Sequence, residues 1–276
     1  MNQHTQGTAL ITGASSGIGK VFAETLAARR SNLILVARRR QRLEELAESL
    51  SRRYAVKVEV LPADLSQEQE IRRVEQHLLQ AENLTMLINN AGFGTPGEFI
   101  DIPIQRTQEM LNVHVVAATR LSWAALQNMR QRDQGTIINV SSMTAFLPFP
   151  TAVSYCATKA YLNVFSEALQ RQLQGTNITI QALCPGLTYT EFHETQDYTG
   201  FERSRFPKWL WMNAEDVVHS SLHALSHKRV IVVPGTRNKV LVWLMTNSCT
   251  AFFLRTLVSI RQRLFSKRPP MRDARQ

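Results

Sequence analysis

Seven short apolar runs, each separated from the next by a segment with helical periodicity, constrain the fold of this chain more than any other feature of its sequence. The runs are unbroken and rich in Val, Ile and Leu, which is typical of strands that are buried on both faces of a sheet. They cover residues 8–12, 33–37, 56–60, 84–89, 135–141, 178–184 and 230–233. This alternation predicts an α/β fold in which one parallel sheet carries helices on both faces, joined by right-handed crossovers.

The segments between the runs show the spacing of amphipathic helices, most clearly over residues 39–53, 67–82, 106–129 and 155–173. Of the 276 residues, 44% are hydrophobic, which is enough for one well-buried domain. No shift in composition divides the chain. We therefore expect one domain over residues 1–236, which would carry any catalytic site, and an extension over residues 237–276 that consists of an apolar helix and a basic tail.

A glycine-rich turn follows the first apolar run directly and leads into a helix over residues 20–30. In such a turn, backbone N–H groups can approach a pyrophosphate at the N-terminus of the helix, where the helix dipole also favours an anion. Glycines alone often mark ordinary turns, but this strand–turn–helix context indicates a doubly wound dinucleotide-binding domain of the Rossmann type. The candidate phosphate contacts are Gly13, Ser15, Ser16, Gly17, Ile18 and Gly19.

Three consecutive arginines stand at the end of the second apolar run, in the sequence Val-Ala-Arg-Arg-Arg over residues 36–40. An acidic residue at this place would bind the ribose 2′-hydroxyl of NAD, and it would repel the 2′-phosphate of NADP. An arginine can instead bind that phosphate through its charge and its planar fork of N–H groups. The arginines could also be only the solvated start of the next helix. We favour NADP(H) over NAD(H) and predict Arg38 as the phosphate contact.

Tyr155 and Lys159 lie four residues apart in a predicted helix, so their side chains share one face. A tyrosine is a poor acid–base group at neutral pH unless its pKa is lowered, and a neighbouring ammonium together with a positive nicotinamide ring would lower it. Ser142 ends the fifth run and could bind a substrate oxygen, while Asn112 could hold a water chain to Lys159. Taken singly, each residue could equally be a helix-surface contact or a cap.

These residues, together with the glycine-rich turn, the sequence Asn-Asn-Ala-Gly over residues 89–92 and Pro185-Gly186, resemble the motifs of the short-chain dehydrogenase/reductase family over residues 7–236. The resemblance implies an oxidoreductase whose catalytic residues are Asn112, Ser142, Tyr155 and Lys159. In that family's reaction a nicotinamide exchanges hydride with a carbonyl or alcohol carbon, the serine and the tyrosine polarise the oxygen, and the tyrosine transfers the proton.

The same resemblance assigns the remaining cofactor contacts. Lys159 would hold the nicotinamide ribose, and the backbone at Thr188 and the hydroxyl of Thr190 would hold the carboxamide. Family members often carry Val or Ile where this chain has Thr188, and Asp64, assigned to the adenosine side, could by itself be a helix cap. The contacts implied are Asp64, Asn90, Ala91, Gly92, Tyr155, Lys159, Pro185, Gly186, Thr188 and Thr190.

Two segments rich in apolar and aromatic residues, 143–154 and 189–212, are expected to line the substrate side of the site. They would suit a small hydrophobic carbonyl or alcohol, such as a steroid-like ketone, a retinoid or a long-chain 3-oxoacyl group, or they could pack as a lid against the core. The alternative function is a catalytically silent dinucleotide-binding sensor or scaffold. Sugar-nucleotide epimerase chemistry shares the Tyr-x-x-x-Lys pair and ranks last, because epimerases differ in glycine spacing and carry a larger substrate domain.

The net charge of +10 is unevenly placed, since residues 255–276 contain seven basic residues and one acid. No aromatic platform is interleaved with these charges, so we expect no nucleic-acid partner. Residues 239–265 are apolar with helical spacing but too interrupted to span a membrane. Together with the basic tail they could lie on an anionic membrane surface, cover the substrate cleft or meet a second subunit.

The polar N-terminus does not resemble a signal peptide, and the three cysteines are far apart in the sequence. We therefore expect a cytoplasmic protein with reduced thiols, in which residues 239–276 could make peripheral contact with a membrane. His219, His223 and His227 recur every four residues, but no carboxylate motif accompanies them, so we expect a surface helix and no metal. The family resemblance implies a homodimer or homotetramer built on residues 106–129 and 155–173.

Overall fold

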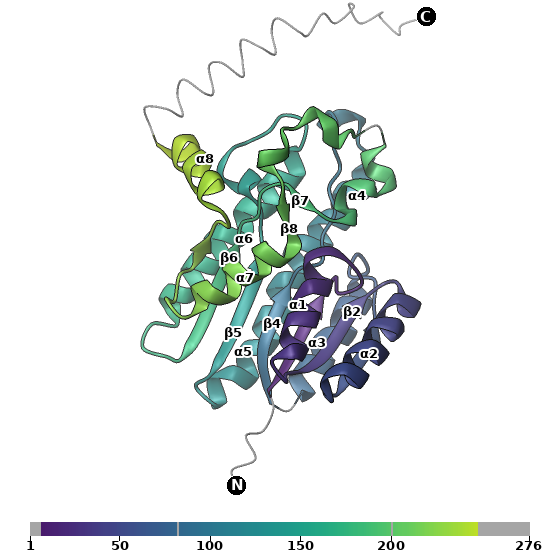
Figure 1. Cartoon of the computed structure of the whole chain (residues 1–276), viewed down its shortest axis with the longest axis vertical. Coiled ribbons are helices and arrows are strands. Elements are labelled where there is room, and N and C mark those ends of the chain that lie inside the picture. The colour runs from purple at the N-terminus through teal and green to yellow at the C-terminus, as the bar shows by residue number, and fades with distance from the viewer. Residues whose placement is uncertain (1–6, 82, 200, 248–276) are drawn as a thin grey trace, which may run out of the picture.

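The computed structural model describes residues 7–81, 83–199 and 201–247, and a seven-stranded sheet forms the centre of this part of the chain (Figure 1). All pairings in the sheet are parallel, and the strands follow the order β3-β2-β1-β4-β5-β6-β9. The strands are β1 (Thr8–Thr12), β2 (Asn32–Ala37), β3 (Val58–Pro62), β4 (Leu84–Asn89), β5 (Gly135–Val140), β6 (Ile178–Leu183) and β9 (Ile231–Val232). The predicted doubly wound α/β fold is confirmed.

Helices cover both faces of the sheet (Figure 1). Apolar side chains of α1, α2 and α7 share one core with the sheet, and those of α3 and α5 share a second core on the opposite face. The helices are α1 (Gly17–Ala28), α2 (Arg40–Tyr54), α3 (Glu68–Gln80), α4 (Ile104–Leu111), α5 (Ala118–Gln131), α6 (Val153–Gln172), α7 (Ala214–Leu225) and α8 (Thr236–Thr246).

The residues of β1 explain why the apolar runs in the sequence are unbroken. Ala9 and Ile11 belong to the core that faces α1 and α7, whereas Leu10 belongs to the core that faces α3 and α5. Successive side chains of a strand point to opposite faces, so a strand with helices on both sides needs an apolar residue at every position.

The winding of the chain reverses between β1 and β4, which are neighbours in the sheet. From β1 the chain winds outward through β2 and β3, and β4, β5, β6 and β9 then follow on the other side. In an open parallel sheet, ligands bind in the crevice at the carboxyl ends of the strands where the direction reverses. The glycine-rich turn follows the carboxyl end of β1, and Asn90 follows that of β4, so the fold brings these two predicted contacts to this crevice.

The helix predicted over residues 106–129 is interrupted. It consists of α4, a π-helical segment over Asn112–Ala117, and α5. A π-helical turn takes up an extra residue, which changes the direction in which the following side chains point, and such turns are frequent at functional sites. Here the segment buries His114, which is 1% exposed. A periodicity averaged over a long window does not detect one inserted residue, so the sequence predicted a single helix.

A second, two-stranded sheet was not predicted. Its parallel strands are β7 (Thr188–Tyr189) and β8 (Met212–Asn213). Between them the chain, named here the 190–211 segment, forms short 3-10 turns at Glu191–Glu194, Gln196–Tyr198, Arg203–Arg205 and Lys208–Leu210. This segment is drawn in green above the sheet in Figure 1.

The last described helix, α8, follows the edge strand β9 (Figure 1). None of the helices in the described part of the chain is both long and apolar enough to cross a membrane. The basic tail lies outside the described residues, so its contacts and the division of the chain at residue 236 stay predictions. The subunit contact through α5 and α6 also stays a prediction, although Trp123 and Val164 are exposed on these helices.

Candidate active site and cofactor cleft

The turn between β1 and α1 has the backbone conformation that a phosphate-binding loop requires. Gly13 and Gly17 have φ angles of +66° and +54°, which residues with a side chain rarely adopt. A Cβ atom on Gly19 would collide with the backbone oxygen of Gly13, so only glycine lets the helix begin so close to the strand. The first turn of α1 contains no acidic residue. Its partial positive charge is therefore not offset by a carboxylate of its own first turn.

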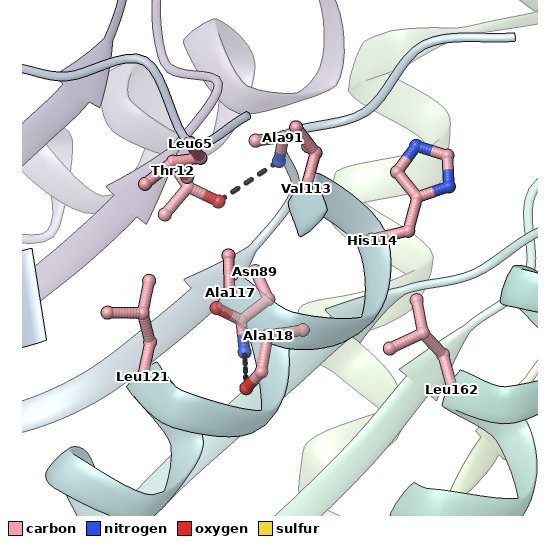
Figure 2. A pocket seen from close by; sticks show the side chains of 10 residues that line it. All are labelled: Thr12, Leu65, Asn89, Ala91, Val113, His114, Ala117, Ala118, Leu121 and Leu162. Carbon is pink, nitrogen blue, oxygen red and sulfur yellow. Dashed lines mark hydrogen bonds between the residues drawn. The ribbon is translucent and has the colours of Figure 1, made fainter. Parts of the chain in front are cut away.

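Thr12 and Asn90 tie this turn to the loop that follows β4. The Thr12 Oγ1 accepts hydrogen bonds from the backbone N–H groups of Asn90 (2.9 Å) and Ala91 (3.0 Å), and Figure 2 shows the bond to Ala91. The Asn90 Nδ2 donates to the backbone oxygens of Thr12 (2.9 Å) and Gly13 (3.2 Å). These four bonds hold the predicted phosphate and adenosine contacts together at the carboxyl ends of β1 and β4.

A cavity of about 10 Å³ lies beneath this junction (Figure 2). Its polar lining comes from Thr12, Asn89 and His114, and Asn89 Nδ2 donates to the Ala118 oxygen at 3.4 Å. The volume corresponds to about one water molecule. A dinucleotide therefore has no room in this cavity.

Arg39, rather than the predicted Arg38, reaches the glycine-rich turn. Its Nε and Nη2 donate to the Ser15 Oγ at 3.1 and 2.9 Å, and Nη2 also donates to the Ser16 Oγ at 2.7 Å. Arg38 is exposed at the end of β2, and its side chain makes no hydrogen bond within the described residues. Neighbouring residues at a strand end point in different directions, and the sequence does not reveal which of two arginines turns toward the loop.

Asp64 and Asn112 both bond to the loop after β3. The Asp64 Oδ1 accepts hydrogen bonds from the N–H and the hydroxyl of Ser66, at 3.0 and 2.8 Å. The Asn112 Nδ2 donates to the backbone oxygen of Ser66 at 2.8 Å. Asp64 therefore stabilises the turn before α3, whose N-cap residue is Gln67, so it is not the helix cap of its alternative interpretation. Its contact with the adenosine stays a prediction. The side chain of Asn112 holds this loop, and its predicted water chain to Lys159 stays a prediction.

The side chains of Tyr155 and Ser142 are neighbours in the site. Ser142 lies two residues after the end of β5, at the start of a short 3-10 turn, where its Oγ accepts a hydrogen bond from Thr144 N at 3.2 Å. Burial raises the pKa of Tyr155 to about 12, and the neighbouring Ser142 hydroxyl acts in the opposite direction. The chain alone therefore does not lower the pKa of Tyr155 as predicted, because the loss of hydration on burial raises this pKa more than the Ser142 hydroxyl lowers it.

Lys159 is buried beside the tyrosine. Its Nζ donates to the Val140 oxygen at 2.8 Å and lies 5.5 Å from the centre of the Tyr155 ring. The Ser141 hydroxyl donates to the Lys159 backbone oxygen at 2.8 Å, which joins α6 to the end of β5. Gly92 adjoins this group, since a Cβ atom there would lie 3.5 Å from the Lys159 Nζ. Burial lowers the pKa of Lys159 to about 8, so the ammonium is still the main form at neutral pH.

His114 is a further polar residue at this site, and it was not predicted from the sequence. Its Nε2 accepts a hydrogen bond from Phe93 N at 3.1 Å, so the proton is assigned to Nδ1, which lies 2.9 Å from the Thr158 Oγ1. The His114 ring lies 5.7 Å from the Tyr155 ring. Burial, reinforced by the charge of Lys159, holds the pKa of His114 well below its usual range. The only indication in the sequence was that His114 is polar while its neighbours Val113 and Val115 are apolar.

The loop after β6 meets the glycine-rich turn from the other side. Thr188 is buried in the small sheet, and its hydroxyl donates to the Gly186 oxygen at 3.0 Å. The Thr190 Oγ1 accepts a hydrogen bond from Phe192 N at 3.3 Å. A Cβ atom on Gly17 would lie 3.1 Å from the Thr190 side chain. The residues predicted to hold the carboxamide therefore adjoin those predicted to hold the pyrophosphate.

The 190–211 segment carries an aromatic cluster that adjoins Tyr155. The Phe192 ring lies 5.9 Å from the Tyr155 ring. The His193 ring stacks on Phe201 at 4.5 Å, its Nδ1 is buried without a hydrogen-bond partner among the described residues, and burial lowers its pKa to about 4. These aromatic side chains pack against one another, and one of them lies against the tyrosine. The cluster consists of Phe192, His193, Tyr198, Phe201, Phe206 and Trp211.

The three regularly spaced histidines line a groove between α7 and α8. The ring of His223 lies 6.3 Å from that of His219 and 5.5 Å from that of His227. Arg229 and Lys239 line the same groove, which has a volume of about 580 Å³. Within the described residues, no group of histidine, cysteine and carboxylate side chains has an arrangement that could hold a metal ion.

Comparisons with solved structures find the same fold in proteins that handle nicotinamide cofactors or ketones. A structure described as a short-chain dehydrogenase from Sphingobium yanoikuyae in complex with NADPH matches 98% of this chain and 99% of that chain, with a TM-score of 0.79 and 31% identity. The bulky-bulky ketone specific alcohol dehydrogenase from Comamonas testosteroni matches 98% of this chain and 96% of that chain, with a TM-score of 0.74 and 31% identity.

Comparisons of sequence point to the same group of proteins. The inactive hydroxysteroid dehydrogenase-like protein 1 of Homo sapiens is 33% identical over 179 residues, which are 64% of this chain and 54% of that protein. The chain spans only about half to three fifths of the length of such curated relatives. A family model described as short chain dehydrogenase matches residues 7–199. The chain therefore belongs to the short-chain dehydrogenase/reductase family.

Proposed function

We propose that this protein is an NADP(H)-dependent oxidoreductase that interconverts a carbonyl and an alcohol on a hydrophobic substrate, with Tyr155 as the proton donor. The observation that carries the proposal is the grouping of Ser142 and Tyr155 with the buried Lys159 at the carboxyl end of the sheet. The turn fits a dinucleotide, because its glycines leave no Cβ atom in the way and the first turn of α1 adds favourable charge.

When bound, a reduced nicotinamide supplies the hydride, with its electron pair, to the carbonyl carbon. The chain's own residues act on the oxygen. The hydroxyls of Ser142 and Tyr155 would bind that oxygen together, and the Tyr155 proton moves to it as negative charge develops there. Since burial raises the pKa of Tyr155 to about 12, the tyrosine holds its proton until this step. The ammonium of Lys159 stabilises the phenolate that remains, and in the oxidation direction the phenolate takes the proton back.

Two observations support a hydrophobic substrate. The side chain that lies against Tyr155 from the 190–211 segment is Phe192, and the rest of the aromatic cluster lies behind it. The alcohol dehydrogenase from Comamonas testosteroni, which this chain resembles over 98% of its length, is described as specific for bulky-bulky ketones. An apolar wall of this kind favours a substrate with large apolar groups on the carbonyl carbon.

A panel of ketones of increasing size, from acetone to aromatic and steroid ketones, tests the proposed reaction. We expect NADPH oxidation, followed by absorbance, with a larger kcat/KM for the bulky apolar ketones, because the aromatic cluster can remove more of their apolar surface from water. A preference for small polar carbonyls would contradict the proposed substrate class.

The second candidate is a dinucleotide-binding protein without turnover. One observation favours it, namely that a relative with 33% identity is described as inactive. The same panel separates the two candidates, since tight NADPH binding without oxidation of NADPH by any ketone would favour the silent protein. The grouping of Ser142 and Tyr155 with the buried Lys159 supports the enzyme.

Arg39→Ala is expected to raise the KM for NADPH by about 10- to 100-fold, because charge-assisted hydrogen bonds to a phosphate contribute about 1.5–3 kcal/mol. The KM for NADH should change by less than about 3-fold, since NADH has no 2′-phosphate. Steady-state kinetics with both cofactors measure these values.

The matched control is Arg38→Ala, which removes the same charge one residue away. A larger effect at Arg38 than at Arg39 would favour the contact predicted from the sequence. A wild-type protein with equal KM values for NADPH and NADH would contradict the proposed cofactor preference.

A further inference from the structure

Glu191 lies in the 190–211 segment and contacts the start of α2. It follows Thr190 in the 190–211 segment, and its Oε2 accepts a hydrogen bond from the Arg39 Nη1 at 2.8 Å. Both of its carboxylate oxygens lie 2.8 Å from the Arg42 Nη1. The bond to Arg39 is the main cause that lowers the pKa of Glu191, and Arg42 adds to it. One carboxylate therefore neutralises part of the charge of two guanidinium groups at the start of α2.

Arg39 is the centre of this bridge. It offers Nη1 to Glu191, while its Nε and Nη2 bind the hydroxyls of Ser15 and Ser16 in the glycine-rich turn. The residue pair Arg39 and Glu191 is 152 positions apart in the sequence. Hydrogen bonds from Arg39 therefore join the glycine-rich turn to the start of the 190–211 segment.

The far end of this connection is the substrate side of the site. Phe192, the residue next to Glu191, lies against the ring of Tyr155 and against Tyr198 in the aromatic cluster. A shift of the Glu191 backbone would therefore move the side chain that borders the tyrosine. The position of Glu191 therefore connects Arg39 and Arg42 to the aromatic side chain beside Tyr155.

A carboxylate and a phosphate compete for the same guanidinium geometry, because both present oxygens to parallel N–H groups. We infer that Glu191 is an internal anion that occupies Arg39 and Arg42 until the 2′-phosphate of NADP(H) replaces it, and that this exchange releases the start of the 190–211 segment. Glu191 is then a specificity-determining residue that weakens NADP(H) binding and leaves NAD(H) binding unaltered. This inference rests on the proposed function, since it requires that NADP(H) binds with its 2′-phosphate at Arg39.

The expected size of the effect follows from the exposure of these groups. The side chains of Arg39 and Glu191 are 43% and 45% exposed, so water screens their attraction and the exchange costs little. We expect Glu191→Gln to tighten the binding of adenosine 2′,5′-bisphosphate by about 3- to 10-fold, while the affinity for 5′-AMP, which lacks the 2′-phosphate, changes by less than about 2-fold. Isothermal titration calorimetry on the full chain measures both dissociation constants.

The control is Glu194→Gln, which removes the same charge three residues away, where the carboxylate pairs with Arg203 at 2.6 Å. This variant should bind both ligands like the wild type, and Glu191→Asp, which keeps the charge, should bind the bisphosphate within about 3-fold of the wild type. Unchanged or weaker binding of the bisphosphate by Glu191→Gln would overturn the inference, the weaker case meaning that Glu191 orients the arginines for the phosphate. Equal affinity of the wild type for the two ligands would instead overturn the proposed cofactor preference itself.

Discussion

A Tyr155→Phe variant should reduce a ketone with NADPH about 10²- to 10⁴-fold more slowly than the wild type, which is the usual contribution of a general acid. The substitution removes only the hydroxyl, and the ring keeps its contacts with His114 and Phe192. The proton and one of the two hydrogen bonds to the substrate oxygen are lost, while Ser142 remains. Single-turnover measurements of NADPH oxidation give the rate of the chemical step directly.

The dissociation constant for NADPH serves as the control for Tyr155→Phe. It should stay within about 3-fold of the wild-type value, because a general acid contributes to the transition state and not to uniform binding of the cofactor. A variant that retains wild-type turnover with a reactive ketone would remove Tyr155 from the mechanism. A variant that loses both turnover and NADPH binding would show that the substitution disturbs the cofactor site and does not remove the proton donor alone.

A Lys159→Met variant should lose about 10²- to 10³-fold in kcat/KM, because the phenolate that forms at Tyr155 is then no longer stabilised by an ammonium. Burial lowers the pKa of Lys159 to about 8, so this stabilisation is present below about pH 8 and is lost as the pH rises through that value. The wild-type kcat/KM for reduction should therefore fall above about pH 8. In Lys159→Met the fall in kcat/KM above about pH 8 should be absent. Measuring kcat/KM for both proteins as a function of pH tests this.

The same variant should be more stable than the wild type when no cofactor is bound. The pKa of Lys159 falls from 10.5 to about 8 on burial, so below pH 8 the folded state carries the whole cost of burying an ammonium, on the order of 3 kcal/mol. Lys159→Met removes this cost and also the bond to the Val140 oxygen, which contributes about 1–2 kcal/mol. We expect a net gain on the order of 1 kcal/mol in the free energy of unfolding at pH 7, measured by urea denaturation.

The pH dependence of stability checks the sign of this effect. Between about pH 8 and 10.5 the unfolded wild type still binds the proton and the folded wild type has released it, so wild-type stability rises with pH in this window. Lys159→Met lacks this group and should show no such rise, so the order of stability should reverse, with the variant more stable at pH 7 and the wild type more stable at pH 10. A variant clearly less stable than the wild type at pH 7 would show that the buried lysine stabilises the fold.

Local patterns in the sequence were enough to predict the strands and much of the candidate site. The bounds of β1 and β4 match the apolar runs residue by residue, because each strand is buried on both faces and its apolar character does not depend on its neighbours. Tyr155 and Lys159 were predicted to meet because a spacing of four places side chains on one face of any α-helix. The Lys159 Nζ lies 5.5 Å from the centre of the Tyr155 ring, which agrees with that expectation.

Contacts between distant parts of the chain could not be predicted in this way. The bond from Arg39 to the glycine-rich turn joins residues 24 positions apart, and the choice between Arg38 and Arg39 depends on the direction of the chain after β2. His114 reaches Thr158 across 44 positions, and only the π-helical turn directs it there. The raised pKa of Tyr155 has the same origin, since the extent of burial is a property of the assembled site.

The amino-acid sequence alone therefore determined the order along the chain of the strands in the seven-stranded sheet, the glycine-rich turn and the tyrosine–lysine pair, because each of these depends on periodicity or spacing within one element and its immediate neighbours. The tertiary structure alone decided that Arg39 faces the turn, that His114 lies beside the tyrosine and that Glu191 binds two arginines 152 and 149 positions away in the sequence. The physical reason is that side-chain direction at strand ends and helix distortions follows from the packing of the whole domain, and local propensity does not encode it.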